Sequence, residues 1–127
     1  MMGQAEIPAI RENDFSASAR VDGGKVQTTL TGNADLNVKS QLDGFLLSLH
    51  QHALTDSVSE VVVDVRNLEF INSSCLKAFV TWISSVQAQP SDDQYRIVFL
   101  SSPRLHWQRR SLHALSCFAN DLVSIQT

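Results

Sequence analysis

The sequence predicts one α/β domain built around a mixed β-sheet, and three observations lead to this fold class. The chain has 127 residues, of which 43% are hydrophobic and 18% charged, which suits a single compact core. A two-strand alternating pattern comes first, and apolar runs then alternate with helix-like stretches. The order ββαβαβα, with a short apolar run after it, implies an antiparallel start followed by right-handed crossovers. We therefore expect four to five strands and three to four helices.

The first regular element is an antiparallel hairpin. Apolar residues at every second position mark strands over 15–21 and 26–30, separated by Asp22-Gly23-Gly24. The two glycines provide the positive-φ positions that a tight turn needs. The preceding residues show no sustained period, so we expect a flexible arm over 1–14 and the folded domain over 15–127.

The middle of the chain has the pattern helix, strand, helix. Apolar residues three and four positions apart predict a first helix over about 37–54. The run Val61-Val62-Val63-Asp64-Val65 is typical of a central strand that is covered on both faces. A second apolar stripe over 76–86 predicts a helix that cannot continue through Pro90.

The last third of the chain predicts a strand, a helix and a short final strand. Residues 95–100 form a buried apolar run, and 122–125 form a shorter one. The helix between them spans about 103–119, with Pro103 in its first turn and an inward face of Leu112, Leu115, Phe118 and Ala119. We expect Cys117 in the core and Trp107 on the solvated outer face of this helix.

Charge and chain-end patterns exclude several classes of protein. Ten Lys and Arg against 13 Asp and Glu give a net charge of −3, so we expect no direct nucleic-acid partner. No apolar stretch reaches the roughly 18 residues of a membrane helix, so we expect no membrane insertion. The first residues lack the pattern of a secretion signal, which favours a cytoplasmic location.

Metal and enzyme motifs are also missing from the sequence. Cys75 and Cys117 have no metal-ligand spacing, and His50 and His52 fit solvated or capping residues better than ligands. There is no Gly-x-Ser-x-Gly motif, no glycine-rich phosphate loop and no His-Glu-x-x-His. We therefore expect no structural metal, no cofactor and no enzymatic activity.

The candidate site follows the central strand. Asn72, Ser73 and Ser74 open the second helix and are all good helix caps, so one of them could simply satisfy free main-chain N–H groups. Two hydroxyls at the positive end of a helix also suit a phosphate group. Cys75 follows in the same turn, and we favour a packing role over a redox-sensitive thiol because no Lys or His partner is evident.

Over about 15–125, element order and two motifs resemble the STAS domain of the anti-sigma-factor antagonist type. The segment 61–76 is similar to the family's apolar strand and the loop that ends in Asp-Ser-Ser/Ala-Gly-Leu, and it reads Asn72-Ser73-Ser74-Cys75-Leu76 here. Gly32-Asn33-Ala34-Asp35 is similar to the Gly-Glu-x-Asp segment before the first helix, a weaker signal. The resemblance implies a non-enzymatic bacterial regulatory module that binds other proteins.

The resemblance also implies a partner and a site. The partner would be an anti-sigma factor that is also a serine kinase, and Ser74 would be phosphorylated, with Ser73 as the alternate. The implied partner-binding residues are Asn33, Asp35, Asn72, Ser73, Ser74, Cys75 and Lys77. Four of them, at 33, 72, 75 and 77, depart from the family's usual residues. The alternative is therefore an unphosphorylated STAS-like subunit of a transporter or signalling complex; a homodimer also stays open.

Overall fold

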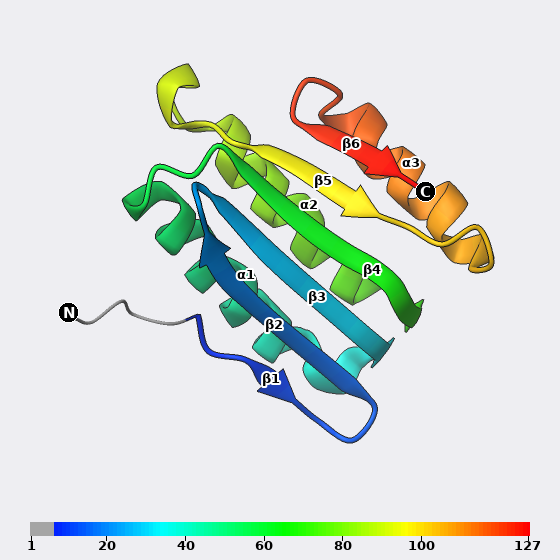
Figure 1. The fold of residues 1–127 in the computed structure, drawn as a ribbon. Coiled ribbons are helices and arrows are strands. Elements are labelled where there is room, and N and C mark those ends of the chain that lie inside the picture. Colours follow the sequence, from blue (N-terminus) through cyan, green and yellow to red (C-terminus); the bar gives the residue numbers. More distant parts are fainter. Residues whose placement is uncertain (1–6) are drawn as a thin grey trace.

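A computed structural model describes residues 7–127, which form a six-stranded mixed sheet (Figure 1). The strands lie in the order of the chain, with β1 to β3 antiparallel and β3 to β6 parallel. They are β1 (Ile10–Arg11), β2 (Phe15–Asp22), β3 (Lys25–Ala34), β4 (Glu60–Ile71), β5 (Arg96–Leu100) and β6 (Val123–Gln126). The helices are α1 (Lys39–Thr55), α2 (Ser73–Gln87) and α3 (His106–Phe118), with short 3-10 turns η1 (Leu36–Val38) and η2 (Ser91–Asp93). The predicted α/β class is confirmed.

The sheet has six strands where the sequence predicted four to five. The additional strand is β1, from the segment expected to be an arm, and its Ile10 pairs with Ala17 of β2. Ile7 and Ile10 are buried, and β1 also contacts α1. Burial of these two isoleucines and pairing with β2 stabilise this short segment against the edge of the core. Residues 1–6, the rest of the expected arm, lie outside the described residues.

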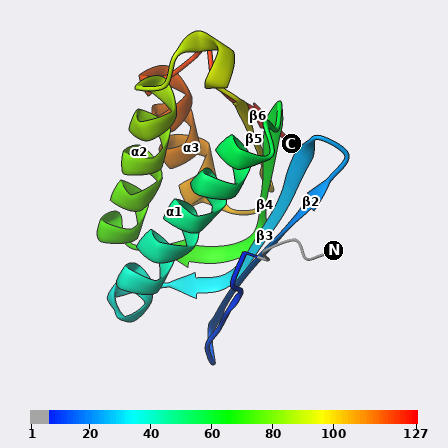
Figure 2. The same ribbon diagram turned by 90° about the vertical axis from the view of Figure 1, so that its left-hand side faces the viewer.

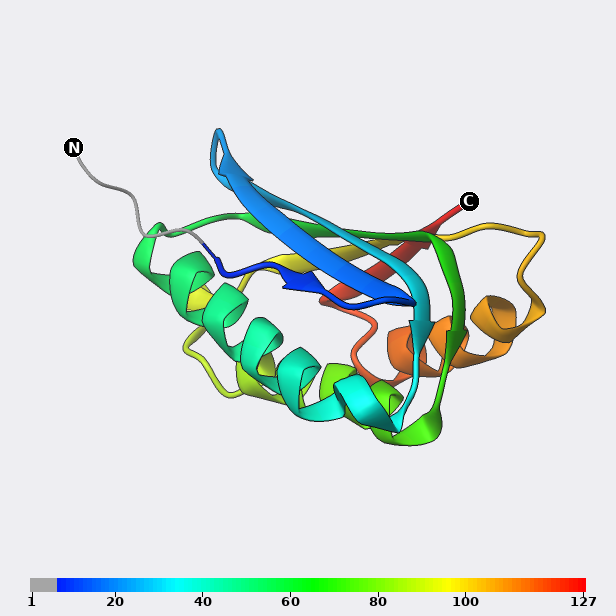
Figure 3. The same cartoon turned by 90° about the horizontal axis from the view of Figure 1, so that it is seen from below.

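All three helices lie on one face of the sheet, as Figures 2 and 3 show. The parallel strands advance in one direction across the sheet, so right-handed crossovers place every helix on the same side. Val61, Val63 and Val65 of β4 are accordingly buried, whereas Val62 and Asp64 on the opposite face are only half-buried. The prediction that this strand is covered on both faces was wrong.

The third helix differs most from its prediction. It begins at His106, three residues after Pro103, and its inward stripe is Gln108, Leu112, Leu115 and Ala119. Phe118 lies off that stripe and is 46% exposed, and Cys117 is exposed as well. Both had been expected to face the core. Phe118 and Ala119 follow Leu115 by three and four positions, and both spacings fit one helical face, so apolar spacing alone could not tell which of them lies inward.

The second half of β4 has no neighbouring strand on its β5 side. Pairing with β5 ends where Asp64 lies opposite Leu100, but β4 continues beside β3 to Ile71. Side chains of α3 bind the main-chain oxygens left open there: Gln108 Nε2 donates to Val65, and Trp107 Nε1 donates to Leu68 at 3.0 Å. Trp107 therefore faces the sheet, not solvent as predicted. These contacts hold the end of β4 in place.

Candidate functional site

Two chain segments meet where β3 and β4 end and the helix layer begins; Figure 3 shows the cyan and green strands turning there together. Ala34 lies opposite Ile71 in the register, and the Asn72 N–H donates to the Ala34 oxygen at 2.9 Å. We call this region the serine corner and define it by residues Asn33, Asp35, Asn72, Ser73, Ser74 and Lys77. The two motifs recognised in the sequence are thus neighbours in space.

The start of α2 is capped by Asn72. Its side-chain oxygen accepts from the Cys75 N–H at 2.9 Å, and its backbone is extended, as an N-cap requires. Ser73 is exposed and Ser74 is half-buried in the first turn. Because Asn72 already provides the cap, neither serine hydroxyl is needed for it. Both hydroxyls lie at the positive end of the helix dipole.

Cys75 lies beneath the serine corner. Its side chain is fully buried, and its thiol donates to the Asp35 main-chain oxygen at 3.2 Å. Burial, with a smaller contribution from the Asp35 carboxylate, raises the pKa of the thiol. The packing role favoured from the sequence is confirmed. A buried side chain cannot contact a partner at the surface, so Cys75 drops out of the set of expected contact residues.

Two exposed apolar side chains flank the serine corner. Leu36, directly after Asp35, is 66% exposed, and Phe70, two residues before Asn72, is 48% exposed. Phe70 is paired with Asn33 across the two strands. Sequence reasoning did not single out either side chain, because a strand end and a helix start carry no apolar period that would mark them. Large apolar side chains left in solvent beside polar ones are typical of protein-binding surfaces.

A buried polar cluster joins α1, α2 and the start of β5, away from the serine corner. His50 is 7% exposed, and its Nδ1 lies 2.7 Å from the Tyr95 hydroxyl, which also accepts from Trp82 Nε1 at 2.8 Å. The expectation of a solvated or capping His50 was wrong. His50 follows Leu46 by four positions and so lies on the apolar stripe of α1, a signal that the sequence did contain.

Known proteins share the fold but little sequence. No family model matches the sequence, and no curated protein matches it. An anti-sigma factor antagonist from Mycobacterium paratuberculosis superposes with a TM-score of 0.61 and 14% identity, over 82% of this chain and 81% of that chain. The chain has the STAS fold.

Two further structures share this fold. SpoIIAA in its unphosphorylated form matches with a TM-score of 0.57 and 13% identity, over 87% of this chain and 88% of its own. The phosphorylated Bacillus SpoIIAA matches with a TM-score of 0.54 and 14% identity, over 87% and 91%. The STAS resemblance seen in the sequence is thereby confirmed at the level of fold.

No three His, Cys, Asp or Glu side chains among residues 7–127 are grouped so that they could hold a metal ion. Within the same residues, every helix is too short or too polar to cross a bilayer.

Proposed function

We propose that the protein is a bacterial regulatory module, an anti-sigma-factor antagonist without enzymatic activity, whose serine corner binds an anti-sigma factor that is also a serine kinase. The position of Ser74 is the main support for this proposal. Ser74 lies in the first turn of α2, and its hydroxyl is not needed as the helix cap because Asn72 provides the cap. The fold is shared with an anti-sigma factor antagonist. One protein with this fold has been solved both with and without phosphate.

The composition of the serine corner supports protein binding. Leu36 and Phe70 provide apolar area that a partner would remove from water. Asn33, Asp35 and Lys77 are exposed around them and supply a polar rim. Apolar centres with polar rims are the usual composition of protein interfaces. Contact at this corner requires no change of fold, because the hydrogen bonds of Asn72 already fix it on both sides.

Phosphorylation of Ser74 would act as a switch through charge. A phosphate adds nearly two negative charges at a half-buried position, where the helix dipole tolerates it in the free protein. A bound partner would have to strip water from that phosphate, and the Asp35 carboxylate in the same corner adds a further negative charge. A penalty of about 3 kcal/mol would weaken binding more than a hundredfold.

The test combines capture of the partner with variants of Ser74. The full chain is used to capture partners from native cytoplasm with and without ATP, and the peptide 66–77 is analysed by mass spectrometry. We expect a kinase-like partner, phosphate on Ser74, tight binding by Ser74→Ala and binding at least about a hundredfold weaker by Ser74→Asp. Ser73→Asp, one residue away and exposed, is the matched control for added charge. Equal affinities of Ser74→Ala and Ser74→Asp would rule out the switch.

A second candidate is an accessory subunit of a transporter or signalling complex that binds without being phosphorylated. The half-burial of Ser74 favours it, since a kinase needs access to the hydroxyl. In the same experiment this function predicts an unmodified 66–77 peptide in a complex with the larger assembly. For this function we expect Phe70→Ser to reduce the amount of the larger assembly that is captured. Ser74→Asp should change that amount only through the negative charge that it adds to the contact surface.

A further inference from the structure

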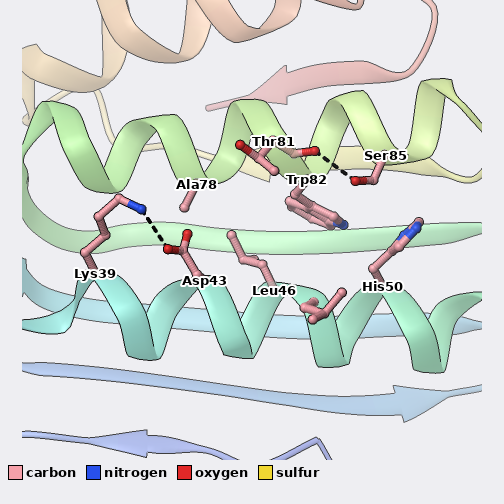
Figure 4. Close-up of a pocket in the computed structure, with 9 residues that line it drawn as sticks. Lys39, Asp43, Leu46, His50, Ala78, Thr81, Trp82 and Ser85 are labelled. Atoms are coloured by element: carbon pink, nitrogen blue, oxygen red, sulfur yellow. Dashed lines mark hydrogen bonds and ion pairs between the residues drawn. The ribbon is translucent and has the colours of Figure 1, made fainter.

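A pocket of about 340 Å³ opens between α1 and α2, on the outer side of the helix layer (Figure 4). Its apolar lining includes Leu46, Leu47 and Ala78, and Trp82 and His50 lie at one end. Leu47 is 58% exposed and forms an outer wall. The serine corner described above uses none of these side chains, so the pocket has no role in the proposed function.

The buried hydrogen-bond chain decides which nitrogen of His50 carries its proton. The Trp82 indole can only donate, so the Tyr95 oxygen accepts from it at 2.8 Å. Tyr95 is 1% exposed, and leaving its single O–H proton unpaired there would be costly. It therefore donates to His50 Nδ1 at 2.7 Å, which must be the unprotonated nitrogen. The proton of neutral His50 is then on Nε2.

The Nε2–H group of His50 is a donor without a partner in the described residues, where only Nδ1 makes a hydrogen bond. His50 as a whole is only 7% exposed, and it lines the pocket. Figure 4 shows the His50 ring and the Trp82 indole both reaching into the space between the two helices. A fixed donor of this kind, held by a buried chain, favours a hydrogen-bond acceptor inside the pocket.

The charges around the pocket cancel. At its far end Lys39 and Asp43 form an ion pair of 2.7 Å, and burial lowers the pKa of His50 and so favours its neutral form. An anionic ligand would lose its hydration without gaining a net positive charge in exchange. Lys39 and His50 are separated by eleven positions of α1, roughly 16 Å at the helical rise, which suits an elongated molecule.

We propose that this pocket binds a small, uncharged and mostly apolar molecule with one carbonyl group, such as a medium-chain acyl ester. The carbonyl oxygen accepts from His50 Nε2, and the aliphatic chain lies along Leu46, Leu47 and Ala78. Three features of the pocket define this chemical class of ligand: the Nε2–H donor of His50, the apolar walls and the absence of net charge. Binding here would place a ligand on the same helices that begin near the serine corner.

The binding test uses Trp82 as a reporter. The chain has two tryptophans, so Trp107→Phe leaves Trp82 as the only one. In this background we expect methyl octanoate to change the fluorescence in a saturable way and to bind about tenfold more tightly than octanoate at pH 8. No saturable change up to the solubility limit of methyl octanoate, or tighter binding of octanoate, would overturn the proposal.

Variants of His50 test the assigned donor. His50→Gln provides one amide oxygen to accept from Tyr95 and one N–H to donate to the ligand, so we expect its affinity for methyl octanoate to stay within about threefold. His50→Met lacks the donor and should bind about tenfold more weakly. Equal binding by both variants argues against the hydrogen bond. If His50→Met does not fold, ¹⁵N NMR of the unaltered protein decides: protonation at Nδ1 overturns the assignment, and protonation at Nε2 supports it.

Discussion

The side-chain amide of Gln108 on α3 donates to the main-chain oxygen of Val65 on β4, at the point where β5 has already ended. Gln108 is 1% exposed, and its own oxygen accepts from the Ser102 N–H at 2.7 Å. Gln108 thus supplies one of the hydrogen bonds that β4 lacks on this side, together with Trp107, and it also fixes the loop before α3. The serine corner depends on it indirectly, because the same end of β4 leads into Asn72.

Replacement of Gln108 by Leu should lower the free energy of unfolding by about 2–4 kcal/mol. The change preserves much of the side-chain volume but leaves the Val65 oxygen and the Ser102 N–H buried without partners. Urea denaturation followed by circular dichroism measures the effect. Arg109→Ala, at the exposed neighbouring position, should change stability by less than about 0.5 kcal/mol. A Gln108→Leu protein as stable as the Arg109→Ala protein would contradict this role.

Two glycine substitutions should have opposite effects on stability. Gly32 has a φ of 93°, and an added Cβ would lie 1.9 Å from the Asp14 oxygen, so Gly32→Ala should cost more than about 2 kcal/mol. Gly44 lies within α1 with open space around it, and Gly44→Ala should stabilise the protein by up to about 1 kcal/mol. Thermal melts of both variants measure the difference. If Gly32→Ala has the same melting temperature as the unaltered protein, Gly32 and the main chain of Asp14 do not pack this closely.

The two cysteines should differ in reactivity. Cys117 is exposed, whereas Cys75 is buried with a raised thiol pKa, so little of it is in the reactive thiolate form. Iodoacetamide at pH 8 should modify Cys117 in the native protein and both residues in urea, as intact-mass measurement would show. Native Cys117→Ser should remain unmodified. Rapid labelling of Cys75 in that variant would be inconsistent with its packed position.

Burial of neutral His50 should make stability depend on pH. Burial lowers the pKa of His50 in the folded state, while the unfolded chain binds this proton below about pH 6.5. The unfolded state then binds more protons, so the free energy of unfolding decreases as the pH falls from about 6.5 to the lower folded pKa. His50→Gln should show a smaller decrease between pH 7.5 and pH 5 in urea titrations. Identical pH profiles would mean that His50 is not held neutral.

Local patterns in the sequence were sufficient for the element order and for one candidate site. Each of the patterns that mattered spans only a few neighbouring positions: the alternation in the hairpin, the β-branched run of β4 and the polar residues 72–74. The structure has the expected elements at these positions. No local pattern placed the segments around Asp35 and Asn72 next to each other. The register of β3 against β4 then brought them together. The roles proposed for Ser74 and its neighbours stay predictions.

Long-range contacts decided the rest. The surroundings of Trp107 and His50 depend on residues tens of positions away: Trp107 faces β4 because it bonds to Leu68, and His50 is buried because it bonds to Tyr95. Ile10 likewise joins the sheet only by pairing with another strand. The one-sided helix layer likewise follows from the direction in which the strands are added, not from any single strand. The amino-acid sequence alone therefore determined the class of fold and the polar turn after its central strand. Only the tertiary structure decided which polar side chains are buried, because their partners are brought to them by packing, not by neighbouring positions in the chain.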